Sequence, residues 1–139
     1  MQKMGLDFGN KTIGIAVSDA LGLTAQAKGV IRRTNLRDDL HIIKEYLEKY
    51  EIDEIVIGMP RNMDGSKGES ARKVQAFVNF LRNNLDLKIT LWDERLTSVQ
   101  AEKILLAADL SRKKRKKVID QLAAAIILQS YLESRENTD

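Results

Sequence analysis

The chain has 139 residues, of which 43% are hydrophobic and 31% charged, with a formal net charge of +3. This length and composition are typical of one globular domain that buries its own core, so we expect a single domain over residues 1–139. With no cysteine and a single histidine, the composition excludes disulfides and thiolate chemistry and argues against a zinc centre.

The chain also lacks the features of a secreted or membrane protein. No signal peptide precedes the first expected strand, and no apolar run approaches the length of a membrane span. We therefore expect a cytoplasmic protein with no membrane partner.

The first expected strand, residues 4–8, carries an aspartate at its centre, Asp7. Aspartate is disfavoured in strands, and a carboxylate removed from water is costly unless something binds it. Gly5 and Gly9 lie two residues to either side, so strand alternation places them on the same face and predicts that this face is open. Two interpretations follow: Asp7 binds a metal ion, or a phosphate through one, or it closes the turn at Gly9.

The elements that follow predict a mixed sheet. Three strands at residues 4–8, 12–18 and 25–33 are expected to pair as an antiparallel meander. Helices and strands then alternate, with the order β-β-β-α-β-α-β-α-α. Their expected positions are a helix at 36–49, a strand at 54–58, a loop at 59–68, a helix around 71–81, a strand at 87–92, a helix opening at 97 and a helix at about 117–134. The order predicts an α/β fold with a five-stranded mixed sheet and helices on both faces.

Three helices begin with a capping signal, namely Asn35, Ser66 with Glu69, and Thr97 with Gln100. The centre of the last helix, residues 122–128, is apolar nearly all round, which predicts burial on most sides. His41 misses the inward stripe of its helix and is expected at the surface, whereas Trp92 is expected in the core.

Acidic residues stand at three places where folding alone does not require them: Asp7, the pair Asp93 and Glu94 after the fifth strand, and Asp120 in the last helix. If the first strand is central and the fourth or fifth lies beside it, these positions converge. Three converging carboxylates need a cation to stay ionised, and oxygen ligands suit Mg²⁺ or Mn²⁺. Such a site hydrolyses phosphodiesters. Each acid taken singly is better explained as a cap or a salt-bridge partner; the three together favour the metal site.

Six consecutive cations come before or within the first turn of the last helix; they are Arg112, Lys113, Lys114, Arg115, Lys116 and Lys117. The helix macrodipole disfavours cations at this end, so we interpret the run as a contact to nucleic acid, the alternative being a solvated loop. Arg61, Asn62 and Lys67 in the 59–68 loop are further candidate phosphate contacts, or plain loop residues. Arg95 is a phosphate clamp or a partner of Glu94.

Four segments in order resemble the YqgF/RuvX family, a ribonuclease H-like group related to the RuvC Holliday-junction resolvases. They are residues 6–9 with 14–19, residues 58–66, residues 93–97 and residues 120–129. The resemblance spans essentially the whole chain. Its one small departure is Ser98, where a second threonine is common, and both residue types can cap a helix.

The resemblance implies a ribonuclease H-like fold and a divalent-metal nuclease with Mg²⁺ or Mn²⁺ as cofactor. The implied role is processing of the 16S ribosomal RNA precursor. Carried over residue by residue, the catalytic and metal-binding acids are Asp7, Glu94 and Asp120. Asp93 is the weaker candidate, because alternation sends it and Glu94 to opposite faces.

Three other functions stay open. A Holliday junction resolvase acting on branched DNA should form a two-fold dimer. A non-catalytic RNA-binding factor of ribosome assembly would use the basic run and leave the acids idle. Asp7 to Gly9 with Thr12 also resembles the phosphate loop of actin-like and sugar-kinase ATPases, which need a second domain that this chain does not supply. The expected partner is nucleic acid, RNA before branched DNA, and the expected state is a monomer or weak homodimer.

Overall fold

The computed structural model describes residues 1–60, 68–93 and 112–136, and within the last range it describes the side chains of residues 122–135. The elements are β1 (Gln2–Phe8), β2 (Thr12–Ser18), β3 (Ala25–Arg32), α1 (Leu36–Tyr50), β4 (Ile52–Met59), α2 (Glu69–Asn84), β5 (Lys88–Asp93) and α4 (Arg112–Glu136). The helix expected to open at Thr97 lies outside the described residues. Among these residues, no helix combines the length and apolar character that a membrane span requires.

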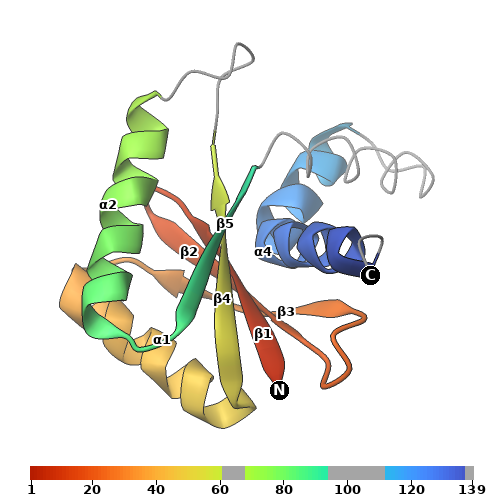
Figure 1. Cartoon of the computed structure of the whole chain (residues 1–139). Coiled ribbons are helices and arrows are strands. Elements are labelled where there is room, and N and C mark those ends of the chain that lie inside the picture. Colours follow the sequence, from red (N-terminus) through yellow and green to blue (C-terminus); the bar gives the residue numbers. More distant parts are fainter. Residues whose placement is uncertain (61–67, 94–111, 137–139) are drawn as a thin grey trace.

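The five strands form one mixed sheet in the order β3-β2-β1-β4-β5. The β1–β2 and β2–β3 pairs are antiparallel, and the β1–β4 and β4–β5 pairs are parallel. Helices α1 and α2 cover one face and α4 covers the other (Figure 1). The α/β fold with a five-stranded mixed sheet and helices on both faces is therefore confirmed. The central strand is β1, with β4 beside it, as the convergence of the acids requires.

Strand alternation divides the buried side chains into two cores. On one face, Leu6 of β1 and Ile57 of β4 pack with apolar residues of α1 and α2, among them Phe77, whose ring stacks on Phe8 with centroids 4.2 Å apart. On the other face, Val56 packs with apolar residues of α4. Each strand of the middle of the sheet is thus covered on both sides.

Helix α4 lies against the face of β1 that carries Gly5. A Cβ atom at Gly5 would lie 2.7 Å from the backbone oxygen of Ala124 and 2.8 Å from the Cβ of Leu128. The prediction that this face is open is therefore wrong at Gly5: the glycine is needed because the helix backbone passes directly over it. Gly14 of β2 is less tightly covered, since a Cβ there would lie 3.5 Å from the Cβ of Ala124.

Of the described helices α1, α2 and α4, only α1 begins as the sequence predicts. The side chain of Asn35 accepts a hydrogen bond from the backbone N–H of Asp38, which confirms the predicted cap of α1. The predicted Ser66 cap is wrong, because α2 is preceded by Gly68 and has no side-chain cap hydrogen bond. Helix α4 begins at Arg112, about five residues before its expected start, so the whole basic run is helical.

Residues 122–128 of α4 are less buried than their composition predicts. Ala124, Ile127 and Leu128 are buried against the sheet, whereas the side chains between them are half-buried and Leu122 is exposed. One face of the helix is therefore packed, not most of its sides. His41 is exposed beside Glu45, as predicted. Trp92, predicted in the core, is half-buried and packs against the core between the sheet and α4.

The far end of α4 is fixed to the sheet by a buried carboxylate, Glu54 of β4. This residue is 1% exposed, and its carboxylate accepts hydrogen bonds from Thr90 Oγ1 at 2.6 Å and Tyr131 Oη at 2.7 Å. Arg135 of α4 lies 3.3 Å from it and Lys3 of β1 3.4 Å. The charge is compensated by cations and hydroxyl donors from three other elements, which is what allows it to be buried.

The surroundings of Glu54 make the stability of the protein depend on pH. Burial by itself raises the pKa of the carboxyl, but the hydrogen bonds from Thr90 and Tyr131 and the nearby ammonium groups outweigh it, so the pKa is lowered from its ordinary value. The folded state therefore favours the ionised form more than the unfolded chain does. That contribution to the free energy of unfolding is fully present above the ordinary glutamate pKa of about 4.3 and is lost as the pH falls through the lower folded pKa.

Substituting Glu54→Gln is expected to lower the free energy of unfolding by about 1–3 kcal/mol near neutral pH, because glutamine keeps the shape but removes the charge that the cations face. The difference from the unaltered protein should shrink as the pH falls below about 4. Urea unfolding at a series of pH values measures both effects, with Glu48→Gln on the exposed side of α1 as the control. A difference that stays constant across the acidic range would contradict this account.

Candidate active site

Asp7 lies near the end of β1, on the face that α4 covers. In the antiparallel ladder it is paired with Gly14 of β2. The point where a Cβ of Gly14 would lie is 3.7 Å from the Cβ of Asp7 and 3.5 Å from the Cβ of Ala124. The space above Gly14 is therefore bordered by both Asp7 and Ala124 of α4.

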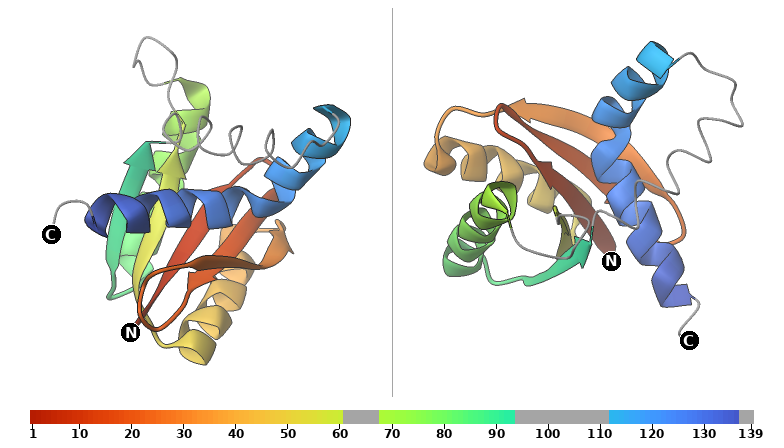
Figure 2. Two further views of the ribbon diagram at one scale, coloured as in Figure 1. Left: turned by 90° about the vertical axis from the view of Figure 1, so that its right-hand side faces the viewer. Right: turned by 90° about the horizontal axis from the view of Figure 1, so that it is seen from above.

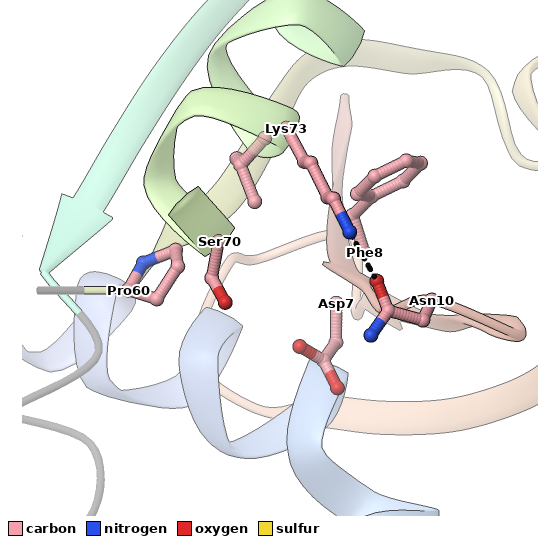
Figure 3. A pocket seen from close by; sticks show the side chains of 8 residues that line it. Asp7, Phe8, Asn10, Pro60, Ser70 and Lys73 are labelled. Carbon is pink, nitrogen blue, oxygen red and sulfur yellow. Dashed lines mark hydrogen bonds between the residues drawn. The ribbon is translucent and has the colours of Figure 1, made fainter. Parts of the chain in front are cut away.

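A pocket of about 200 Å³ opens at this end of the sheet. Its walls come from the end of β1, the β1–β2 turn, the residue that follows β4 and the first turns of α2. The lining residues are Asp7, Phe8, Gly9, Asn10, Pro60, Ser70, Lys73 and Val74. Figure 3 shows the side chains of Asp7, Asn10, Ser70 and Lys73 around this space. A carboxylate, an amide, a hydroxyl and an ammonium group thus share one cavity.

The β1–β2 turn that borders the pocket is held by Arg33. Its Nη1 donates to the carbonyl oxygens of Gly9 at 2.8 Å and Asn10 at 3.3 Å, and its guanidinium carbon lies 4.2 Å from the centre of the Phe8 ring. Its Nε faces the buried carboxylate of Asp39 at 3.9 Å. Because a planar guanidinium can bridge two carbonyls while stacking on a ring, this one residue fixes both Phe8 and the turn. The pocket wall next to Asp7 is therefore preorganised.

The sequence-predicted acids differ in how the structure places them. Asp120 belongs to the helical backbone of α4 four residues before Ala124, and therefore on the same face of the helix, one turn toward its start. The side chain of Asp120 and all of Glu94 lie outside the described residues. Within the part of the chain that is described, no three acidic or histidine side chains form a cluster. The meeting of Asp7, Glu94 and Asp120 stays a prediction.

Asp93, the weaker candidate, lies at the last position of β5. It is paired with Met59, whose side chain belongs to the core under α1 and α2. Its neighbour Trp92 points the other way, with its Nε1 donating to Ser130 of α4 at 3.2 Å. Alternation therefore places Asp93 on the face opposite to Asp7.

The predicted basic contacts fall mostly where side chains are not described. Arg61, Asn62, Lys67 and Arg95 lie outside the described residues. The run 112–117 forms the opening turns of α4. Figure 2 shows α4 crossing the sheet, with its C-terminal part over the β5 side and its opening turns projecting past the sheet. The backbone of the basic run thus stands apart from the packed core.

Sequence reasoning missed three residues of the pocket, namely Asn10, Ser70 and Lys73. Lys73 Nζ donates to Asn10 Oδ1 at 3.4 Å and so joins α2 to the β1–β2 turn (Figure 3). Ser70 and Lys73 are three residues apart at the start of a helix and lie off its apolar stripe. That spacing was readable in the sequence, but only the adjacency of β1 and β4 brings α2 beside Asp7.

Two solved structures share the architecture of this chain over nearly its whole length. RuvC of Thermus thermophilus in complex with a Holliday junction substrate has a TM-score of 0.62, with 12% identity, over 99% of this chain and 97% of that one. The fowlpox virus Holliday junction resolvase has a TM-score of 0.53, with 15% identity, over 96% of this chain and 99% of that one. At such identities the likeness shows the fold alone, which is ribonuclease H-like.

Sequence comparison identifies the family as well as the fold. A protein of Halothermothrix orenii is 54% identical over 95% of this chain and 94% of its own length, and one of Clostridium acetobutylicum is 52% identical over 96% and 99%. Both carry the name "Putative pre-16S rRNA nuclease". The family model described as "RuvX: Holliday junction resolvase" matches residues 1–134. The chain therefore belongs to the RuvX family.

Proposed function

We propose that this protein is a divalent-metal-dependent endonuclease that hydrolyses phosphodiester bonds in the precursor of 16S ribosomal RNA. The observation that carries the proposal is the carboxylate of Asp7, which lines a polar pocket at the end of the central strand of a ribonuclease H-like sheet. Family membership and the names of the close relatives support the reaction and the substrate. A nuclease with this substrate would work in the cytoplasm, where ribosomal RNA is made in bacteria.

One residue of the pocket, Asp7, has the chemistry to bind a hard cation. Asp7 offers carboxylate oxygens, and the α4 backbone that carries Asp120 passes next to it. We assign Asp7, Glu94 and Asp120 as the residues that would hold Mg²⁺ or Mn²⁺, ions that prefer oxygen ligands. A cation there would activate the attacking water and stabilise the leaving oxygen.

The cations of the chain would hold the substrate. The run Arg112–Lys117 forms the opening turns of the helix that carries Asp120, so RNA bound along it would approach a metal site that includes Asp120. Arg61, Lys67 and Arg95 are assigned as further phosphate contacts, since they follow the ends of β4 and β5 in the sequence. Phosphate contacts of this kind fix the position of the backbone and carry no sequence information.

The test is cleavage of a 16S precursor fragment with Mg²⁺, with Mn²⁺ and with EDTA. We expect cuts with either cation and none with EDTA, and no cuts in a fragment of the same length taken from mature 16S RNA. Failure to cut the precursor with any divalent cation would contradict the proposal. Salt-sensitive RNA binding without cleavage would instead favour a ribosome-assembly factor.

The family description supports a second substrate, a Holliday junction. Two symmetric cuts across a four-way junction need two active sites, so this activity requires a two-fold dimer on the DNA. Sedimentation with and without a bound junction distinguishes the two functions. A monomer in both conditions, with cleavage of precursor RNA but not of the junction, supports the RNA substrate.

A further inference from the structure

The polar side chains that line the pocket beside Asp7 include a second set of groups with a different chemistry. Lys73 contributes an ammonium group, Ser70 a hydroxyl and Asn10 an amide. Because Asn10 Oδ1 already accepts from Lys73, the Nδ2 of the same amide remains as its donor toward the pocket. All three residues can therefore present N–H or O–H donors to one ligand.

The fold makes little energetic use of the Lys73 ammonium group. Its side chain is 51% exposed, and its ion pair with Glu69, at 3.7 Å, joins two exposed groups one helical turn apart. Such pairs contribute little to stability. The apolar stripe of α2 passes through Ala71 and Val74, and Lys73 lies off it. Its ammonium group lies beside the β1–β2 turn, at the edge of the pocket, and is exposed enough to contact a ligand there.

The ligand class follows from the charges. Convergent ammonium, hydroxyl and amide donors match the oxygens of a phosphate group. An anion next to the Asp7 carboxylate needs a positive group on its other side, and Figure 3 shows Lys73 and Asn10 across the pocket from Pro60, with Asp7 beneath them. The turn that carries Asn10 is already fixed by Arg33, so little ordering is needed when the ligand binds.

We propose that Asn10, Ser70 and Lys73 form a subsite for a backbone phosphate of the nucleic acid, next to the phosphate that is cleaved at Asp7. The proposal rests on the proposed function for its substrate. It adds residues that act in binding and not in the chemical step.

The experiment measures binding of a short single-stranded RNA in EDTA, so that no cleavage takes place. Lys73→Gln is expected to weaken binding about tenfold and to reduce the slope of log K against log salt by about 0.7, the value for one phosphate contact on a single strand. Lys73→Arg should restore most of the affinity. The matched control is Lys44→Gln at an exposed position of α1, which removes the same charge away from the pocket.

Ser70→Ala is the second variant, expected to weaken binding about threefold because it removes one neutral donor. With a divalent cation and precursor RNA, Lys73→Gln should raise KM with kcat nearly unchanged, as loss of uniform binding does. Equal affinities and salt slopes for Lys73→Gln and Lys44→Gln would overturn the subsite.

The two proposals fail in different ways. If the unaltered protein binds no RNA, the subsite and the proposed function are both overturned. If Lys73 governs RNA binding and the protein cuts no nucleic acid with any cation, the phosphate contact stands and the nuclease is overturned.

Discussion

Replacing Asp7 with asparagine is expected to reduce cleavage of precursor RNA by about a thousandfold or more, with the fold intact. Asparagine has nearly the same size, so packing against Gly14 and the α4 backbone should not change. It removes the negative charge that a divalent cation requires, and loss of a residue that acts as part of a catalytic unit abolishes most of the rate. Single-turnover cleavage with saturating Mg²⁺ measures the effect.

A control variant shows whether the loss of cleavage depends on the position of the lost charge. Asp86→Asn makes the same change at an exposed site before β5 and should leave cleavage unaffected. Binding of Mn²⁺, measured by calorimetry, should weaken in Asp7→Asn alone. Cleavage by Asp7→Asn at the rate of the unaltered protein would remove Asp7 from the site and, with it, the shared metal site with Glu94 and Asp120.

The substitution Gly5→Ala is expected to lower the free energy of unfolding by about 2–4 kcal/mol, the upper range for overpacking. The added methyl would meet the Ala124 carbonyl oxygen at 2.7 Å and the Leu128 Cβ at 2.8 Å, and neither atom lies at the end of a flexible side chain. The helix must therefore move off the sheet or the strand must bend. Urea unfolding measures the loss.

Gly14→Ala is the control for Gly5→Ala, because it adds the same methyl to the same face of the sheet. Its nearest neighbours would be the Cβ atoms of Ala124 at 3.5 Å and Asp7 at 3.7 Å, which are ordinary contacts. We expect a change in stability of less than about 1 kcal/mol. Similar losses for the two variants would mean that the close approach of α4 at Gly5 does not limit packing.

The sequence was sufficient for most of the sheet because alternation and helical periodicity are local signals. It could not decide what the glycines in β1 are for. A glycine in a strand is compatible with an open face or with a closely packed partner, and only the path of α4, more than a hundred residues later, resolves Gly5 in favour of the second. The start of α4 was missed for a related reason, since six cations at a helix N-terminus oppose the macrodipole and predict a later start.

The residues of the candidate site also fall into two groups: those that the local sequence indicates and those that only the fold brings to the site. Asp7 stood out because an acid inside a strand is locally anomalous. Lys73 carried no such anomaly: a lysine on the polar side of an amphipathic helix is expected anywhere. It reaches the pocket because β4 lies beside β1 and the helix after β4 begins at that end of the sheet. Residues of this kind are recognised from topology and not from local pattern.

If Asp120 binds the metal ion as proposed, catalysis depends on the angle at which α4 crosses the sheet. Tyr131, which is fastened to Glu54, and Asp120 are eleven residues apart, or about 16 Å along the helix axis. A tilt of about 5° around the fastened end would move the backbone of Asp120 by about 1.4 Å. Displacements of about 1 Å can cost a hundredfold in rate. The buried carboxylate of Glu54 and the close contact at Gly5 both oppose such a tilt, so they would also fix the position of a metal ligand at Asp120.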